Sequence, residues 1–359
     1  MKLKNLFRRG GGEPAPRQTI EIRLAPEQLL PLMLDERIER LGPSHPETVE
    51  VGHRLAVVLA RKPEQRAQAL DLFRQVTSTK ADTLGETHPE TLAVMAECAA
   101  LLQVDGQPAT AEETWRYVFE TRRRDLGPAH PDTLSAACGL ARALGALRRG
   151  PEAAALWRHV ADHRTRTHGE DHPDTRTALH NLAVSLLDTA QPAEAETIFR
   201  RLLRTSGPRE DEEHPLVDVR ANLATSLYLQ GKREGAEAEF RTVLAEQERR
   251  SGPDHRHTLI TRHNLAKVLN DLGRAEEAES LLRTVLAGRA RTLGEEHLDT
   301  HRTRENLASV LLARDDGREQ EAVRLLRRCL NGYRTQLGEN HPLTRAAGER
   351  LTALTGHHA

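Results

Sequence analysis

Apolar residues recur along this chain at helical spacing, in segments separated by short polar breaks. In the segment from about Pro173 to Leu187 they are Leu179, Leu182, Ala183, Leu186 and Leu187. A break at Ala190-Gln191-Pro192 follows, and a second apolar series then runs Ala195, Ile198, Phe199, Leu202 and Leu203. Apolar positions three and four residues apart predict amphipathic helices. The pattern therefore predicts two helices joined by a short turn.

The same layout recurs, with breaks at Gln230-Gly231, Leu272-Gly273 and Asp316-Gly317. Sustained alternation of the kind typical of strands is confined to Thr19–Leu24, near the amino terminus. We therefore expect an all-α protein. Seven two-helix units are predicted between about Pro46 and Gln336, with a helix before them near Pro26–Arg40 and one after them near Pro342–Leu354.

A glycine–histidine motif lies between these helix pairs at a period of about 42 residues. Its histidines are His45, His88, His130, His172, His214, His255, His297 and His341. A glycine precedes each histidine by three residues except at His214, where the insertion Pro208–Asp211 intervenes. Proline follows six of the histidines directly, and threonine lies three residues after seven of them. A regular period of this length indicates a solenoid, in which each unit buries its core only against its neighbours.

Each motif predicts the end of one helix and the start of the next. Gly127 can adopt the left-handed conformation that ends a helix, and Pro131 suits the first position of the following helix. A histidine just before that proline is expected to cap the helix or to make another structural hydrogen bond. We prefer this role to metal binding or acid–base catalysis. The helically spaced pair His159 and His163 is interpreted as chance surface histidines, and no metal site or cofactor is expected.

A small residue, an alanine twelve residues later and a bulky residue four beyond that recur in five units. They read Ala99/Ala111/Trp115, Ala141/Ala153/Trp157, Ala183/Ala195/Phe199, Ala224/Ala236/Phe240 and Ala266/Ala278/Leu282. The chain thus resembles the tetratricopeptide-repeat family. With its 42-residue period, Leu293-Gly294-Glu295-Glu296-His297 and Asn264-Leu265-Ala266, it is similar to the kinesin light chain-like subclass of bacterial type. The resemblance implies a right-handed α-solenoid of about seven tetratricopeptide-like helix pairs. The motor-binding heptad region of kinesin light chains is absent, so no motor role is inferred.

Composition and charge narrow the domains and the partners. We expect a flexible basic tail over residues 1–25, one solenoid with half-repeat helices at both ends over 26–355, and a tail over 356–359. The 52 basic and 53 acidic residues nearly cancel, which argues against nucleic-acid binding. No segment is apolar for long enough to cross a membrane. The alternative for the tail is weak contact with a membrane surface, because Leu3, Leu6 and Phe7 can share a face beside four cations.

The sequence favours a binding protein over an enzyme. It has no phosphate-binding glycine loop and no Gly-x-Ser-x-Gly nucleophile motif. Cys98, Cys138 and Cys329 are odd in number and scattered, which fits a reducing cytoplasm. We expect a non-enzymatic adaptor that binds a peptide or protein segment in the concave groove. The alternative is a regulatory or sensor subunit acting on a separately encoded ATPase or other effector.

Four asparagines mark the expected binding surface: Asn181, Asn222, Asn264 and Asn306. Each lies two residues before its packing alanine, and two residues correspond to about 200° around a helix. The resemblance implies that these amides hold the backbone of an extended peptide, with Thr225, Lys267 and Arg302 as neighbours. The alternative is that they bridge neighbouring repeats. The corresponding residues of the first three units are Arg54, Glu97 and Gly139, which confines the expected peptide site to residues 173–336.

Overall fold

A computed structural model describes residues 25–205, 213–314 and 316–356 of the chain. Within these ranges the protein forms sixteen α-helices, one short 3₁₀ helix and no strand. This confirms the predicted all-α class. The expected tails, apart from Ala25 and Gly356, and the strand-like segment Thr19–Leu24 lie outside the described residues. So does the insertion before His214.

The helices divide between two compact units, of which the first ends at Thr121 and the second begins at Arg122. The first unit contains α1 (Pro26–Leu41), α2 (Pro46–Leu59), η1 (Pro63–Gln65), α3 (Arg66–Leu84), α4 (Pro89–Val104) and most of α5 (Pro108–Leu126). The second contains α6 (Pro131–Ala146), α7 (Gly150–His168), α8 (Pro173–Asp188), α9 (Pro192–Thr205), α10 (Glu213–Leu229), α11 (Arg233–Ser251), α12 (Arg256–Asp271), α13 (Ala275–Leu293), α14 (Leu298–Ala313), α15 (Glu319–Leu337) and α16 (Pro342–Gly356).

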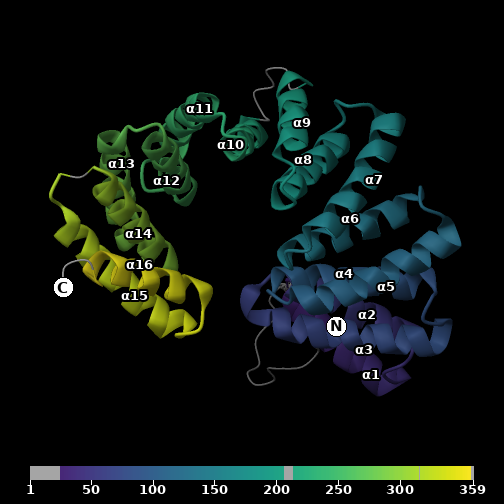
Figure 1. Cartoon of the computed structure of the whole chain (residues 1–359). Coiled ribbons are helices and arrows are strands. Elements are labelled where there is room, and N and C mark those ends of the chain that lie inside the picture. Colours follow the sequence, from purple (N-terminus) through teal and green to yellow (C-terminus); the bar gives the residue numbers. More distant parts are fainter. Residues whose placement is uncertain (1–24, 206–212, 315, 357–359) are drawn as a thin grey trace, which may run out of the picture. The chain divides into compact units, whose positions relative to one another are not determined.

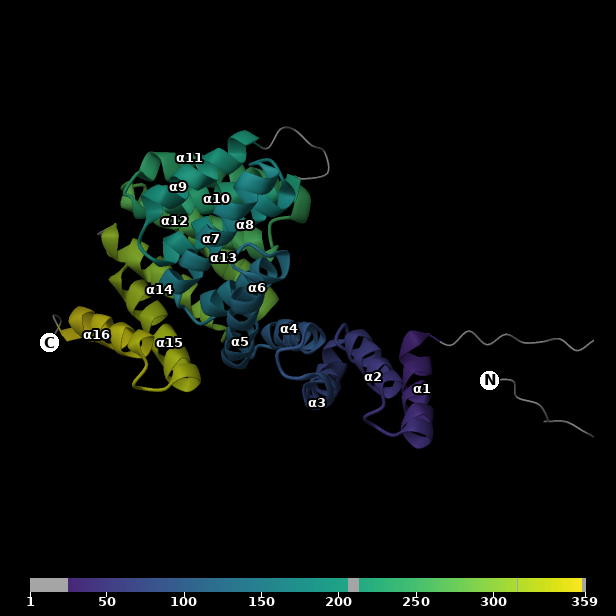
Figure 2. The same cartoon turned by 90° about the vertical axis from the view of Figure 1, so that its right-hand side faces the viewer.

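The helices pair in chain order, as the hydrophobic pattern predicts. Seven pairs run from α2/α3 to α14/α15, and α1 and α16 lie outside them as single helices (Figure 1). In the first unit α1, α2 and α3 lie side by side (Figure 2). In the second unit every helix from α6 to α16 packs against the next one, and the first helices of successive pairs also touch, α8 with α10 and α12 with α14.

The recurring histidines cap the first helices, as expected. In seven motifs Nδ1 of the histidine accepts a hydrogen bond, 3.1–3.4 Å long, from the backbone N–H two residues later; these are His45, His88, His130, His172, His255, His297 and His341. The bond satisfies one of the backbone N–H groups left free in the first turn of a helix. The eighth, His214, follows the first residue of α10, and its side chain lies outside the described residues.

The threonine of the motif ties the turn to the preceding helix. In four motifs its hydroxyl donates a hydrogen bond of 2.8–3.0 Å to the carbonyl of the glycine six residues earlier; these are Thr91, Thr258, Thr300 and Thr344. Gly85, the acceptor for Thr91, has a φ of 101°, a conformation that an L side chain rarely adopts. Gly-x-x-His-Pro-x-Thr is therefore explained as a joint between helices.

The core follows the register of small and bulky residues. The packing alanines Ala183, Ala224 and Ala266 are fully buried, and the wedge residues Trp157 and Phe199 are 4% and 0% exposed. Small residues let paired helices approach closely, and each aromatic side chain fills the space beside them. This packing fixes the rotation of every first helix, and with it the direction in which the four asparagines point.

Candidate functional site

The four asparagines lie on first helices α8, α10, α12 and α14, and all four are partly buried. Thr225, Lys267 and Arg302 lie on the same helices. We use the name first-helix face for the side of α8, α10, α12 and α14 that carries these predicted site residues. All seven residues belong to the second unit, so the structure brings the predicted site residues onto one body. Their hydrogen bonds, however, divide the asparagines into two kinds.

Asn222 and Asn306 are bonded to the preceding repeat. Nδ2 of Asn222 lies 3.2 Å from Nε2 of His180, and Nδ2 of Asn306 lies 2.7 Å from Nε2 of His263. An amide nitrogen can only donate, so each imidazole accepts through Nε2 and is neutral. Burial lowers the pKa of His180, and burial together with neighbouring cations lowers the pKa of His263 to about 3. These two amides bridge repeats, which is the alternative that the sequence left open.

Asn181 and Asn264 have no such bond. Neither side chain has a hydrogen-bond partner among the described residues. The equivalent of the bridging histidine is Cys138 for Asn181 and Ala221 for Asn264, and neither side chain can accept as an imidazole does. Both amides therefore keep a donor and an acceptor for another molecule.

The first unit contains a related bond at the same register. Nε2 of His53 lies 2.8 Å from a carboxylate oxygen of Glu97, the residue that occupies the asparagine position of α4. The hydrogen bond with Glu97 raises the pKa of His53. In all three bonds the histidine lies one residue before the asparagine position of its own repeat. It bonds to the side chain at the asparagine position of the next repeat, which is an amide in Asn222 and Asn306 and a carboxylate in Glu97.

The neighbours that the sequence singled out occupy different surroundings. The Thr225 hydroxyl donates to the carbonyl of Ala221 at 3.0 Å, so it is bonded within its own helix. Arg302 is exposed, and its Nη1 lies 3.3 Å from Asp299. Lys267 is also exposed, and its Nζ lies 5.3 Å from the centroid of the Tyr228 ring.

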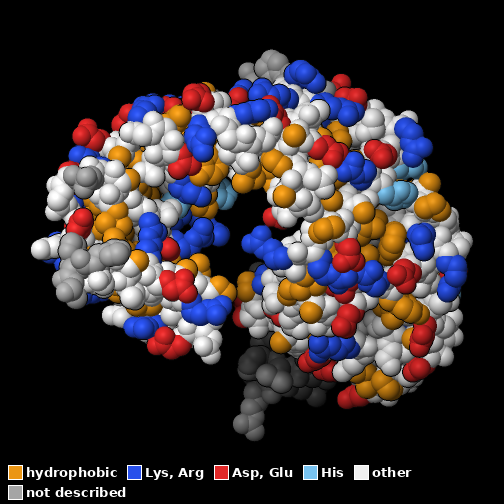
Figure 3. Space-filling model, viewed as in Figure 1, with side chains coloured by type: hydrophobic (Ala, Val, Ile, Leu, Met, Phe, Trp, Pro, Cys, Tyr) orange, Lys and Arg blue, Asp and Glu red, His pale blue; other side chains and the backbone are white. Residues whose placement is uncertain are grey.

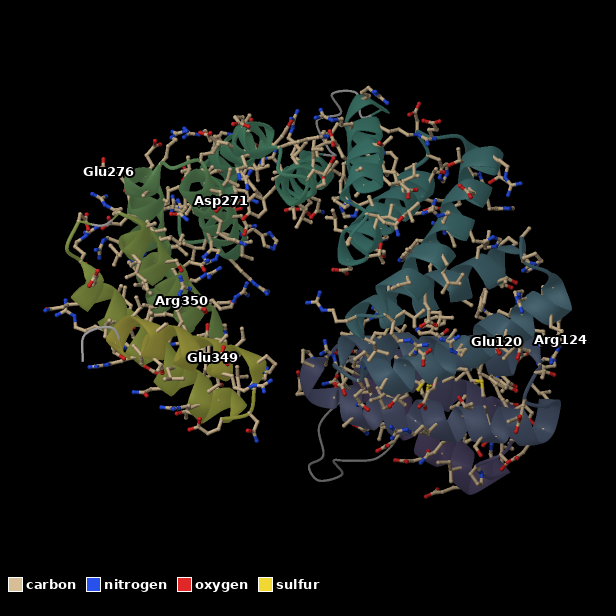
Figure 4. All side chains as sticks on the ribbon, viewed as in Figure 1. Glu120, Arg124, Asp271, Glu276, Glu349 and Arg350 are labelled. Atoms are coloured by element: carbon tan, nitrogen blue, oxygen red, sulfur yellow. The ribbon has the colours of Figure 1, made fainter. Side chains whose placement is uncertain are left out.

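Tyr228 also belongs to the candidate site, although the sequence did not predict it. Its hydroxyl donates a 2.8 Å hydrogen bond from α10 to Oδ2 of Asp271 on α12, and Arg233 lies 3.9 Å from the same oxygen. Burial and the bond to Asp271 raise the pKa of Tyr228 to about 12. Asp271, labelled in Figure 4, is the last residue of α12, and Glu276, also labelled there, lies in the first turn of α13. The tyrosine links two repeats while its ring supports Lys267.

A small open pocket of about 110 Å³ lies between α12, α13 and α14. It is lined by Ala266, Lys267, Asn270, Asp271, Leu282, Asn306, Ser309 and Val310. Of the predicted site residues it brings together only Lys267 and Asn306. Lysine and arginine lie near its edge: Arg289, Arg302 and Lys267 are close enough to His263, the partner of Asn306, to lower the pKa of that imidazole further after burial. In Figure 3, Lys and Arg side chains gather over α12 and α14.

Two buried arginines of the first helices, Arg262 on α12 and Arg304 on α14, have structural roles. Arg262 is 8% exposed and donates to Glu248 on α11 and to the carbonyl of Pro253. Arg304 is 2% exposed and binds Glu295 in the turn before its own helix. These guanidinium groups join a first helix to the element before it and are not available to an acidic partner.

In the described ranges no three His, Cys, Asp or Glu side chains are arranged to hold a metal ion. Nε2 of His159 lies 3.0 Å from the carbonyl oxygen of Pro128, to which it donates, so this histidine of the helically spaced pair has a structural partner. None of the helices that the structure describes is long and apolar enough to cross a membrane.

A family model described as tetratricopeptide repeat matches residues 139–206, 217–289 and 258–335. Among solved structures, a putative kinesin light chain with nearly identical tetratricopeptide-like repeats from Podosopora anserina is 26% identical; the match covers 57% of this chain and 98% of that one, with a TM-score of 0.49. No curated protein sequence matches this chain.

Two further structures share the fold over most of this chain. The apo form of the quorum sensor NprR from B. thuringiensis is 14% identical over 92% of this chain and 97% of that one, with a TM-score of 0.54. A Signal Transduction ATPase with Numerous Domains from Pyrococcus horikoshii, which has a tetratricopeptide repeat sensor, is 13% identical over 91% of this chain and 50% of that one, with a TM-score of 0.55.

Proposed function

Because this chain belongs to the tetratricopeptide repeat family, whose members are generally non-enzymatic scaffolds for protein interaction, we propose that it is an adaptor for an extended protein segment. The segment binds along the first-helix face of the second unit. Its backbone is held by Asn181 and Asn264, and its side chains lie against the surface between them. Three free, buried cysteines support a reducing, cytoplasmic setting.

The division among the asparagines carries this proposal. A primary amide offers donor and acceptor together, which matches the N–H and C=O groups of a peptide backbone. The amide NH₂ groups of Asn222 and Asn306 donate a hydrogen bond to a histidine of the preceding repeat. Asn181 and Asn264 lie at the same position of their repeats, and neither the NH₂ group nor the oxygen of their amides has a hydrogen-bond partner among the described residues. We therefore assign peptide contact to the second pair and repeat bridging to the first.

Paired double variants test this assignment. Random peptides displayed on phage are selected on the full chain, and the dissociation constants of the selected peptides are measured for each variant. Asn181→Ala with Asn264→Ala should leave the melting temperature unchanged and weaken binding by about 1–3 kcal/mol for each lost amide. Asn222→Ala with Asn306→Ala is the matched control and should lower stability, by about 1 kcal/mol for each lost bond.

The outcome that would reject the proposal is equally specific. If the folded Asn181→Ala, Asn264→Ala variant binds the selected peptides as tightly as the wild type, the first-helix face is not the peptide site. If both double variants lose stability equally and neither loses affinity, all four asparagines serve the fold alone.

The alternative function is a regulatory or sensor subunit acting on a separately encoded ATPase or other effector. Two structures with the same fold are described as a quorum sensor and as a signalling ATPase with a tetratricopeptide repeat sensor, at identities that establish the fold only. Co-purification with a nucleotide-hydrolysing protein whose turnover changes when this chain is added would favour the sensor. Binding of short peptides without any effect on such a protein would favour the adaptor.

A further inference from the structure

The pocket between α12, α13 and α14 has an apolar floor and a polar mouth. Ala266, Leu282 and Val310 form the floor and are 0–2% exposed. Lys267, Asp271, Asn306 and Ser309 supply polar groups around it. A volume of about 110 Å³ suits a single side chain with a short aliphatic stem and a polar end.

Two opposite charges at this mouth do not neutralise each other. Lys267 and Asp271 are four residues apart on α12, a spacing at which a cation and an anion ordinarily pair. Instead, Tyr228 contacts both: its ring lies under the lysine ammonium and its hydroxyl donates to the aspartate, which Arg233 also approaches at 3.9 Å. Among the described residues Lys267 has no carboxylate partner. Tyr228 thus holds a strong donor and a strong acceptor one helical turn apart.

A third group in the pocket is unsatisfied. Asn270 lies between these two residues in the chain, and its side-chain oxygen is buried without a hydrogen-bond partner in the described part of the protein. A buried polar atom without a partner is costly, and a shift of this amide toward the pocket would let an N–H group brought by a ligand relieve that cost. The pocket therefore offers one donor, Lys267, and two acceptors, Asp271 and Asn270.

We propose that this pocket recognises a glutamine side chain of the bound segment. The carboxamide oxygen accepts from Lys267, its NH₂ group donates to Asp271 and Asn270, and its two methylene groups lie on Leu282 and Val310. This inference rests on the proposed function, since the glutamine belongs to a segment that lies on the first-helix face. It adds a side-chain preference to what the asparagines recognise in the backbone.

Other side chains match the pocket less well. A glutamate brings no donor for Asn270 and places its charge beside Asp271. A lysine ammonium enters the field of Lys267 and of Arg302, both near enough to His263 to lower the pKa of that imidazole. A leucine fills the floor but leaves all three polar groups without partners, so an aliphatic probe binds with the charges desolvated and unpaired.

Capped single residues test the pocket without a peptide. N-acetyl-glutamine methylamide is titrated into the full chain and followed by NMR, in parallel with the glutamate, lysine and leucine analogues. We expect saturable shifts of α12 and α14 amides with glutamine, at an affinity at least about fivefold above the other probes, which corresponds to about 1 kcal/mol. Lys267→Met and Asp271→Ala should each remove that preference.

Two further variants separate recognition from general damage. Tyr228→Phe should weaken glutamine binding too, because Asp271 loses its 2.8 Å bond and is released to pair with Lys267 or Arg233. Asp188→Ala is the matched control, since Asp188 occupies the position of Asp271 on α8, is exposed, and lies 3.6 Å from Arg148. It should bind glutamine as the wild type does.

Equal affinity for the leucine or glutamate probe, or no saturable shift with glutamine, would overturn the proposal. These results are distinguishable from a failure of the proposed function. If the glutamine probe fails while the Asn181→Ala, Asn264→Ala variant still loses affinity for displayed peptides, only the pocket assignment is wrong.

Discussion

Gly332, on α15, is the point at which two neighbouring helices leave no space for a side chain. A Cβ atom added there would overlap three atoms of the His301 imidazole on α14. His301 is fully buried, and its Nδ1 lies 3.0 Å from Nη1 of Arg304. Its ring also packs edge-on against Tyr333, with centroids 5.9 Å apart. The imidazole therefore has no vacant position to move into.

The Gly332→Ala substitution should accordingly destabilise the protein. Forcing extra volume into a packed interior costs about 1–3 kcal/mol, and the directness of this overlap places the cost at the upper end. Alanine recovers about 1 kcal/mol, because it loses less backbone entropy than glycine on entering a helix. The expected net loss is about 2 kcal/mol in the free energy of unfolding.

Urea denaturation followed by far-ultraviolet circular dichroism measures the loss, and hydrogen exchange locates it in α14 and α15. Gly145→Ala is the matched control: it also replaces a helical glycine, but nothing lies within 4 Å of the added Cβ. It should be neutral or stabilise slightly. Removing the ring as well, in His301→Ala with Gly332→Ala, should cost less than the sum of the two single changes. A Gly332→Ala protein as stable as Gly145→Ala would refute the packing argument.

Two other measurements test the fold. Trp157→Ala removes a wedge that is 4% exposed and should cost about 3–5 kcal/mol; exchange protection should fall first in the helices around α7, and equal loss at α15 would contradict neighbour-only packing. The folded pKa of His263, about 3, lies below its ordinary 6.5, so its contribution is present above pH 6.5 and is lost as the pH falls toward 3. This contribution should decline by about 1.4 kcal/mol per pH unit below 6.5; the stability of His263→Gln should therefore decline less steeply than that of the wild type, and an unchanged slope would show that His263 does not titrate in this range.

Helices and their ends could be predicted from the sequence because the turns carry explicit signals. The first helix of one unit was expected from about Pro173 to Leu187, and α8 runs from Pro173 to Asp188. A proline fixes the start, and a polar break with no further apolar position at helical spacing marks the end. The capping role of the histidines followed from the same reasoning, since only a local hydrogen bond was required.

The bonding of the asparagines could not be predicted by looking at one repeat at a time. The register places Asn222 and Asn264 at equivalent positions of α10 and α12. Whether each amide is bonded depends on the residue just before the asparagine of the preceding repeat. That residue is His180 for Asn222, which is bonded, and Ala221 for Asn264, which is not. That signal was present in the sequence, 42 or 43 residues upstream, and a comparison across repeats would have found it.

The contribution of Tyr228 was beyond such a comparison. It lies outside the register of aromatic wedges, and its contacts with Lys267 and Asp271 depend on a side-chain rotamer that spans two helices. Spacing in the chain gives the face of a helix but not the reach of a long side chain across its neighbour. The pocket has the same origin, because three helices must pack before its floor exists.

The histidine–asparagine bonds have a consequence for how arrays of this kind change. Whether the amide of an asparagine can bind a ligand depends on whether a histidine of the preceding repeat already bonds to it. The residues that decide ligand binding therefore include one from the neighbouring unit. Duplicating or reordering whole units would therefore change which asparagine amides are bonded to a histidine and which are available to a ligand, without altering a single asparagine. One substitution at a junction, Ala221→His, would place a bridging imidazole opposite Asn264 and close it, as His180 does for Asn222. Selection can thus change the specificity of such a chain by substituting the residue of the preceding repeat that faces the asparagine and does not itself contact the ligand.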